Sequence, residues 1–520
     1  MFDAARHRRM PLALLAALAA AITVATLLTS CSHQRALVQA PGEPQEKLTT
    51  MVTNDADVII IGAGLSGLAT ALELKKAGLR PLVLELAPRV GGRVRTLRYR
   101  WNEEDLAVDS GMEEYWESNP AVEYLMALKL PHRSDVAMSS MRLAGKLFTL
   151  GSTDLDVETY IKRLFTASER GALERFKKQV APTVRQLVAY QHKNDGDAML
   201  PAALLGLKDI SFKDYVMKEA KLPAKVADWV RVSIECEIGT EWHKISALDG
   251  LAEFHIFLGN EGKGELSYRV TGGNDAFALG LAAEVGWQHI LTNQRVTVVR
   301  RRGNRSLVQV MDATTNRQMI YEAKHVVTTV PPYRLVMEVQ FDPPLSNSKL
   351  AAIKSQTYGS YFKAHVFVPK TAERFWTDQG GESALPILSD SELGVIYDGN
   401  PDHQGKTKIL SLLVHGAQAE SFNFMPLDLV RDLVKNSLDR LWPGIKGEIL
   451  NMEFYRYHPR AIASWPVGRS RFDELSQAVR RPENGLYFAG DFTESSHSDG
   501  AFLSARRVVR QILKAEGAAP

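Results

Sequence analysis

The chain has 520 residues, of which 45% are hydrophobic and 24% are charged. This composition is typical of a globular protein with a large core, and the length predicts more than one domain. The net charge of +3 and the lack of basic blocks with interleaved aromatic residues argue against nucleic-acid binding. The two cysteines, Cys31 and Cys236, have neither metal-ligand nor redox-pair spacing. We therefore expect no metal site, and we expect Cys236 to be a packed, inert thiol.

The first 31 residues have the pattern of an export signal. Arg6, Arg8 and Arg9 precede an uncharged, mostly apolar run, which ends at Leu28-Thr29-Ser30-Cys31. These four residues resemble the bacterial lipobox, in which the cysteine is lipidated, so we expect a membrane-anchored lipoprotein on the periplasmic side. An uncleaved membrane helix and a soluble exported form remain alternatives, and Arg8-Arg9 is a partial twin-arginine signal. Residues 32–55 are polar and predict a flexible tether.

A dinucleotide-binding unit follows the tether. Residues 57–61 form a short apolar run typical of a buried parallel strand. Gly62-Ala63-Gly64-Leu65-Ser66-Gly67 comes next, and residues 68–77 have helical composition. Residues 80–85 predict a second strand that ends in an acid, Glu85. The strand, helix and acid make this GxGxxG pattern far more specific than the glycines alone.

Each part of this unit has a physical task. The first glycine permits a tight turn, the second lets the backbone approach a pyrophosphate, and the third lets the helix pack on the strand. The start of the helix offers unpaired N–H groups to the phosphates, and the acid accepts hydrogen bonds from the ribose hydroxyls. The expected contacts with the dinucleotide are Gly62, Gly64, Leu65, Ser66, Gly67 and Glu85.

The next motif distinguishes FAD from NAD. Arg89-Val90-Gly91-Gly92-Arg93 resembles the GGR segment of the glutathione-reductase-like FAD proteins, especially the flavin-containing amine oxidases. Further motifs of that family occur in its order: Val108-Asp109-Ser110-Gly111, Thr271-Gly272-Gly273, Arg295-Val296-Thr297-Val298, the strand-to-proline segment His325–Pro331, Leu486–Asp491 and Asp499-Gly500-Ala501. Met112 departs from the family where a second glycine is common, and Asp491 stands where Glu is commoner.

The resemblance implies an α/β fold with a discontinuous, Rossmann-like FAD-binding domain of the glutathione-reductase type. That domain would comprise residues 56–112, 265–331 and 480–516, interleaved with an α+β substrate domain of residues 113–264 and 332–479. FAD contacts would also include Gly91, Gly92, Arg93, Val296, Gly490, Asp491, Gly500 and Ala501. A helix beginning near residue 499 would aim its positive end at the reduced flavin.

The resemblance also nominates three catalytic residues. Lys363 lies in a predicted strand, residues 358–368, at the position of the family lysine that contacts flavin N5 through water; the alternative is an exposed lysine. Trp465 would be one aromatic wall of the substrate site, or else a core tryptophan. His497 stands where a tyrosine is common, and it could wall the site, act as a base, bind an acidic group of the substrate, or simply face solvent. No cysteine lies near the last two, so FAD is expected to be noncovalent.

The middle of the chain is the least informative part. Residues 157–193 and 221–237 have helical composition and are expected to roof the substrate site. Glu235, Glu237 and Glu241 could attract a cationic amine, although ordinary solvated carboxylates are the simpler interpretation.

The expected function is FAD-dependent oxidation of a C–N bond in an amine or amino acid to an imine. Hydride passes to the flavin. The reduced flavin is then reoxidised by oxygen, which yields hydrogen peroxide, or by another electron acceptor. The alternatives are a flavin-dependent desaturase or dehydrogenase of a nonpolar substrate, which the presence of Lys363 argues against, and a non-catalytic lipoprotein stabilised by FAD.

Overall fold

A computed structural model describes residues 49–52, 55–136, 139–150, 157–193, 200–258 and 265–518. The export signal, Cys31 and most of the tether expected from the sequence lie outside these residues. Among the described helices, none is both long and apolar enough to cross a membrane.

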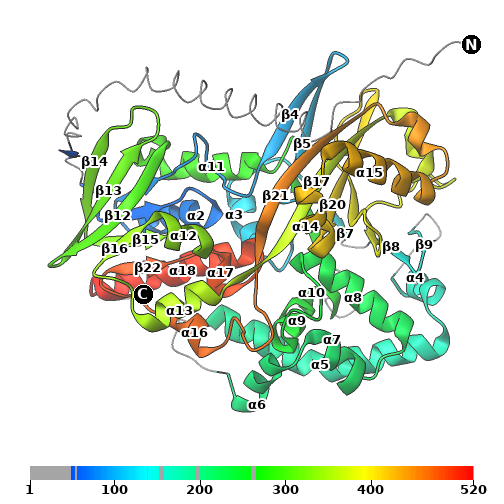
Figure 1. Ribbon diagram of the computed structural model, residues 1–520, viewed down its shortest axis with the longest axis horizontal. Helices are drawn as coiled ribbons and strands as arrows, with labels where there is room; N and C mark the ends of the chain where they lie inside the picture. The colour runs from blue at the N-terminus through cyan, green and yellow to red at the C-terminus, as the bar shows by residue number, and fades with distance from the viewer. Residues whose placement is uncertain are drawn as a thin grey trace, which may run out of the picture. The chain divides into compact units, whose positions relative to one another are not determined.

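A five-stranded parallel sheet forms the centre of one half of the fold (Figure 1). Its order is β11-β3-β2-β15-β22, and its strands are β11 (Ile290–Leu291), β3 (Pro81–Leu84), β2 (Val58–Ile61), β15 (His325–Thr328) and β22 (Leu486–Phe488). Both of the strands expected around the glycine turn are therefore confirmed. The sheet brings together strands more than 400 positions apart in the sequence. Its apolar strands pack into core clusters on both faces, as is typical of parallel sheets.

Helices from both ends of the chain cover this sheet. The helix α2 (Leu65–Lys76) packs against α18 (Ser498–Ala515) and α11 (Asp275–Val285). Apolar side chains of all three helices share one core cluster with β2 and β3. The helix expected from residue 499 to 514 is confirmed as α18.

A mostly antiparallel sheet adjoins the parallel one, in the order β1-β14-β13-β12-β16. Its strands are β1 (Thr49–Met51), β14 (Gln318–Ala323), β13 (Arg305–Asp312), β12 (Gln294–Arg302) and β16 (Gln340–Asp342). β12 contains Val296, and its pairing with β13 shifts register between Val296 and Val298.

A seven-stranded sheet dominates the other half of the fold, in the order β21-β17-β20-β19-β18-β8-β9. Its strands are β21 (Asn451–Ser464), β17 (Thr357–Pro369), β20 (Thr407–His415), β19 (Val395–Asp398), β18 (Ile387–Ser389), β8 (Ser140–Leu143) and β9 (Lys146–Phe148). The strand expected around Lys363 is thus confirmed as β17. It is buried along most of its length on both faces, so Lys363 points into the interior and not into solvent.

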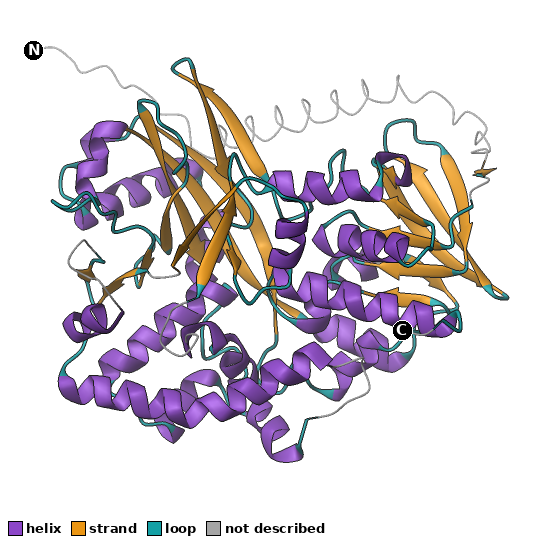
Figure 2. Cartoon of the chain, turned by 180° about the vertical axis from the view of Figure 1, so that it is seen from behind, coloured by secondary structure: helices purple, strands orange, loops and turns teal. Residues whose placement is uncertain are grey.

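Helices gather beside the large sheet (Figure 2). They include α4 (Val157–Leu164), α5 (Ala167–Lys193), α7 (Phe212–Asp214), α8 (Ala224–Ile238), α9 (Ala247–Glu253) and α10 (His255–Leu258). The helical expectation for residues 157–193 and 221–237 is confirmed, with a break between α4 and α5. Cys236 lies in α8, free and buried in the cluster beneath these helices, as expected.

The remaining elements connect the sheets. They are the hairpin β4 (Thr96–Trp101) and β5 (Glu104–Asp109), the small sheet of β6 (Tyr115–Trp116), β10 (Leu266–Val270) and β7 (His132–Val136), and the helices α3 (Ala121–Ala127), α12 (Pro332–Glu338), α13 (Asn347–Ser355), α14 (Gly416–Phe424), α15 (Leu427–Leu441), α16 (Glu474–Arg480) and α17 (Asp491–Glu494). β5 ends at Asp109, directly before the segment that contacts Lys363.

Candidate active site

The glycine turn between β2 and α2 has the geometry that its sequence predicts. Gly62 has a φ of +108°, which favours glycine. A Cβ on Gly67 would stand 1.9 Å from the carbonyl oxygen of Gly62, whereas one on Gly64 would meet nothing within 4 Å. Gly64 is the N-cap of α2 and provides no side-chain cap. No side chain at position 64 therefore blocks the first N–H groups of α2, which a phosphate could reach.

Glu85 holds this turn in place. One of its carboxylate oxygens accepts a hydrogen bond from Ala63 N at 2.6 Å, and the other accepts one from Ala87 N at 2.8 Å. Each carboxylate oxygen retains a lone pair for a further donor. Glu85 is therefore well placed at the end of β3, and its contact with ribose hydroxyls remains a prediction.

Two segments that lie far apart in the sequence meet at one place. Arg93 forms a bidentate ion pair with Asp491, at 2.6 and 2.7 Å, across 398 positions of sequence. Gly490 N donates to Ser504 Oγ at 2.8 Å, and that oxygen lies 3.2 Å from Ser66 Oγ in α2. The residues nominated as cofactor contacts near both termini thus share a single site.

Buried arginines fix the segment that carries Asp491. Arg507 donates to Phe488 O at 2.7 Å and to the carboxylate of Glu494 at 2.6 Å. Arg480 donates to Thr493 O at 2.5 Å. The side chains of both arginines and Glu494 are at most 2% exposed, so they lock α17 in position without reaching the site themselves.

The residues of this site fit a flavin dinucleotide. The N-terminus of α2 has no side-chain cap, and the N-cap residue of α18 provides none, although the carboxylate of Asp499 accepts a hydrogen bond from Gly500 N at 2.8 Å in the first turn of α18. The hydroxyl of Tyr358 and the indole nitrogen of Trp465 are buried and have no hydrogen-bond partner among the described residues. A cavity of about 300 Å³ adjoins Gly92. Its lining is Arg89, Gly92, Arg95, Phe454, Tyr455 and Arg456. Open helix ends and clustered guanidinium groups are the chemistry that binds a pyrophosphate.

Lys363 is fully buried, and acceptors of the protein surround its ammonium group. It donates to the carbonyl oxygens of Asp109 and Gly111, each at 2.8 Å, and it pairs with Glu113 at 2.5 Å. Glu113 also accepts from the hydroxyl of Ser411 at 2.9 Å. These contacts match the three N–H groups of a lysine. The contact of Lys363 with flavin N5 through water remains a prediction.

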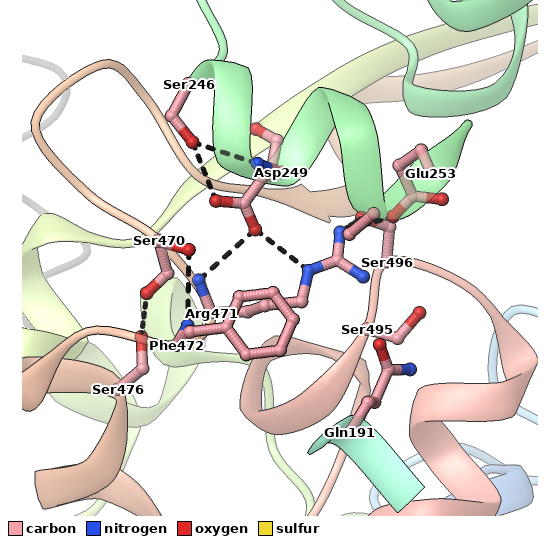
Figure 3. Close-up of polar contacts among 12 residues, drawn as sticks. Gln191, Ser246, Asp249, Glu253, Ser470, Arg471, Phe472, Ser476, Ser495 and Ser496 are labelled. Atoms are coloured by element: carbon pink, nitrogen blue, oxygen red, sulfur yellow. Dashed lines mark hydrogen bonds and ion pairs between the residues drawn. The ribbon is translucent and has the colours of Figure 1, made fainter. Parts of the chain in front are cut away.

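His497 lies at the N-terminus of α18 and pairs with Glu253 at 3.0 Å. Glu253 also pairs with Arg471, and Arg471 pairs with Asp249 at 2.8 Å. Figure 3 shows the Arg471 side chain running between the two acids. Burial alone would lower the pKa of His497, but the neighbouring carboxylates, Glu253 foremost, raise it to about 9.

Trp465 is 1% exposed and belongs to the core beneath the parallel sheet. The guanidinium of Arg471 lies 4.8 Å from the centroid of its ring, a cation–π contact. The structure thus gives Trp465 a packing role, and its role as an aromatic wall remains a prediction.

The three glutamates nominated in the middle of the chain differ in their surroundings. Glu235 pairs with Arg231 at 3.0 Å, and Glu241 pairs with Lys244 at 2.6 Å. Glu237 has no hydrogen bond or ion pair to its carboxyl among the described residues. Burial raises the pKa of Glu237 to about 7; the charge of His497 lowers it, and those of Glu114 and Glu253 raise it.

Sequence reasoning missed the partners that set the charges of these residues. Glu113, Asp249, Glu253 and Arg471 belong to no motif, and Arg471 lies 218 positions from Glu253. One local signal existed for Glu113, because it follows Met112, where the chain departs from the family pattern.

The family model of flavin-containing amine oxidoreductases matches residues 65–513. Among curated proteins, the L-amino-acid oxidase of Sistrurus catenatus edwardsii is 24% identical over an alignment of 497 residues that covers 90% of this chain and 88% of the relative. The L-amino-acid oxidase of Vipera ammodytes ammodytes is 23% identical over 490 residues, covering 89% and 94% of the two chains.

Solved structures share the fold. Wild-type putrescine oxidase bound to putrescine superposes with a TM-score of 0.71 at 21% identity, covering 88% of this chain and 99% of the other. Cyclohexylamine oxidase from Brevibacterium oxydans IH-35A gives a TM-score of 0.68 at 18% identity, with coverage of 89% and 100%.

Proposed function

Because the chain belongs to the flavin-containing amine oxidoreductase family, we propose that it oxidises a C–N bond of an amine or amino acid to an imine, with oxygen as acceptor and hydrogen peroxide as product. The observation that carries this proposal is the meeting of Arg93 and Asp491 beside the glycine turn. This ion pair brings the segment after β22 next to the glycine turn and α2. Together these segments offer the hydrogen-bond donors that a flavin dinucleotide needs.

The residues that would hold FAD follow from this geometry. The N–H groups at the start of α2 and the nearby arginines would bind the pyrophosphate, and Glu85 would accept from the adenosine ribose. Asp491 would accept from the ribityl chain, while Gly91 and Gly92 keep the backbone close without side chains. When bound, FAD supplies the redox chemistry by accepting a hydride equivalent from the carbon beside nitrogen and returning the electrons to oxygen.

The protein's own residues orient the substrate and control charge. The positive end of α18 would stabilise negative charge at the flavin pyrimidine. Lys363 holds Asp109 and Gly111 through its ammonium group, which fixes the backbone after β5. Only a neutral amine can lose hydride, and a buried site with a nearby cation favours the neutral amine over its ammonium form.

The visible spectrum of the purified full-length chain tests the function. We expect a yellow protein whose flavin band bleaches when an amine or amino acid is added without oxygen, and which recovers with release of hydrogen peroxide when air is admitted. Bleaching only by a nitrogen-free substrate would instead favour the dehydrogenase alternative. A flavin that dithionite alone reduces would favour the non-catalytic alternative.

We further propose that the chain is exported and anchored through a lipid on Cys31. The basic start, the apolar run and the lipobox-like residues 28–31 support this proposal. We expect Cys31→Ala to abolish incorporation of labelled palmitate in a bacterial host. Equal labelling of the variant and the unaltered chain would contradict the assignment of Cys31.

A further inference from the structure

Four charged side chains, three of them buried and the last partly exposed, alternate in sign from the helix α9 to the start of α18. Asp249 pairs with Arg471, Arg471 pairs with Glu253, and Glu253 pairs with His497. The first three side chains are 2–4% exposed. Ser246 donates to Asp249 at 2.7 Å, so the far end of the row is also hydrogen-bonded (Figure 3).

The row ends in a cation that reaches accessible space. The side chain of His497 is 24% exposed, against 3% for its partner Glu253. Its ring nitrogen contacts the buried Glu253, and burial is the largest influence on the pKa of His497, so the imidazole is partly packed and partly accessible. His497 directly precedes Ser498–Ala515, the helix whose first turn is nominated to face the flavin.

The groups around His497 set its charge. Glu253 from α9, Glu237 from α8 and Asp499 from α18 all favour its protonated form. Arg471 is the other cation of the row, and its guanidinium also donates to Ser496 Oγ at 3.4 Å. A carboxylate that is shared between an arginine and a histidine remains ionised: burial would raise the pKa of Glu253, but Arg471 and His497 lower it.

We propose that Glu253 and Arg471 hold His497 as an imidazolium at the substrate site, and that this cation selects amines that also carry a carboxylate, as α-amino acids do. Glu253 and Arg471 act as positioning residues, because they work through His497. The proposal rests on the amine-oxidising function above and narrows its substrate class.

The other carboxyl groups near His497 do not reverse this preference. The negative charge of Glu253 is neutralised by its ion pairs with Arg471 and His497. Burial raises the pKa of Glu237 to about 7, so near neutral pH a large fraction of it is uncharged. The uncharged form of Glu237 does not repel a substrate carboxylate, and the fraction that remains ionised can take the proton of the substrate ammonium and leave the neutral amine. A diamine would place a second cation in reach of the imidazolium.

Matched pairs of substrates test the selection. The pairs are L-leucine with isoamylamine, L-phenylalanine with phenethylamine, and L-ornithine with putrescine, each differing by one carboxylate. We expect kcat/KM to favour at least one amino acid over its amine. His497→Gln, which is neutral, should reduce that ratio about ten- to a hundredfold, the range for loss of one charged hydrogen bond. His497→Arg, which keeps a cation, should retain more of the ratio than His497→Gln.

Binding of a carboxylate without an amine gives a second readout that needs no turnover. Isocaproate and hydrocinnamate should bind the unaltered holoenzyme in calorimetry, and binding should weaken as the pH rises through about 9, where His497 loses its proton. In Glu253→Gln the carboxylate that favours the imidazolium is gone, so this loss should move to lower pH. If Glu253→Gln does not fold, weaker binding of the two carboxylates to His497→Gln than to His497→Arg still tests the cation itself.

The outcomes separate this inference from the proposed function. If no amine or amino acid bleaches the flavin, the proposed function fails. If amines bleach it but every decarboxylated partner reacts as well as its amino acid, or if His497→Gln leaves the ratio unchanged, the function stands and the role of His497 is wrong. If carboxylates bind to Glu253→Gln with the same pH dependence as to the unaltered enzyme, Glu253 does not hold His497 in its protonated form.

Discussion

At the scale of single residues, buried ion pairs decide what each functional side chain can do. Lys363 and Glu113 are both almost completely buried, 0% and 6% exposed, and pair at 2.5 Å. Removing one partner of such a pair leaves an uncompensated charge in the interior, which costs far more than the pair contributes. Any test of Lys363 as a catalytic group must therefore separate chemistry from stability.

A double substitution makes this separation. We expect Lys363→Met alone to lower the free energy of unfolding by about 3–5 kcal/mol, because Glu113 loses its cation. The double variant Lys363→Met with Glu113→Gln should recover most of that loss, as measured by urea unfolding of the two proteins side by side. A single variant as stable as the unaltered chain would show that Glu113 is not a buried charge.

The same double variant then tests the predicted contact with the flavin. If Lys363 assists reoxidation through a water, the stable double variant should keep its FAD and still react slowly with oxygen in stopped-flow measurements. Reoxidation at the unaltered rate would leave Lys363 with the purely structural task of holding residues 109–113.

At the scale of elements, the turn between β2 and α2 offers two glycines with opposite roles. A Cβ on Gly64 meets no protein atom within 4 Å, whereas a Cβ on Gly67 would stand 1.9 Å from the backbone oxygen of Gly62. The φ of Gly64 is −73°, which any residue adopts. The fold itself therefore does not require glycine at position 64. We expect that the bound ligand does, because its pyrophosphate would approach the backbone there.

We expect Gly64→Val to produce a folded protein that does not retain FAD, because the new side chain occupies the approach of the pyrophosphate. Gly67→Ala, the matched control, should instead destabilise the fold by about 1–3 kcal/mol through overpacking. Circular dichroism and the flavin absorbance of the purified variants distinguish the two effects. A yellow Gly64→Val protein would contradict the site.

Elements of this kind are what the sequence predicts well. The strand, glycine turn and helix from Val58 to Lys76 depend on neighbours in the chain, and β17 and α18 follow from local pattern. The row from Asp249 to His497 does not follow from local pattern. Its members lie on segments that come close to one another only after the helices pack on the sheets. Trp465 illustrates the same limit: its position suggests an aromatic wall, but its burial depends on packing in one core cluster with β2 and β3, which lie far from it in the sequence.

At the scale of the whole molecule, one site draws on both ends of the described chain. FAD bound there would contact α2, β12 and the segment after β22 at once, so it should stabilise the folded state as a unit. At a free concentration of 100 times Kd, we expect FAD to add about 2.7 kcal/mol to the free energy of unfolding. Thermal melting of the apoprotein with increasing FAD measures this effect.

Asp491→Asn is the matched control for that experiment, because it removes the charge that pairs with Arg93 and nearly preserves the shape. We expect its melting temperature to require more FAD for the same rise. Riboflavin, which lacks the pyrophosphate and the adenosine, should stabilise either protein less. An apoprotein whose melting is indifferent to FAD would overturn the site as a whole.

The strand order β2-β15-β22 has a consequence for biosynthesis. β22 pairs with β15 but leaves the ribosome long after it, since Thr328 and Leu486 are separated by roughly 160 residues, about 10–30 s of translation. During that interval the edge of β15 has no partner on that side and is open to wrong pairing with other nascent chains. If Asp491 binds the flavin as proposed, FAD can be captured only after Asp491 has emerged, so we expect the incomplete sheet to be exposed before the cofactor binds.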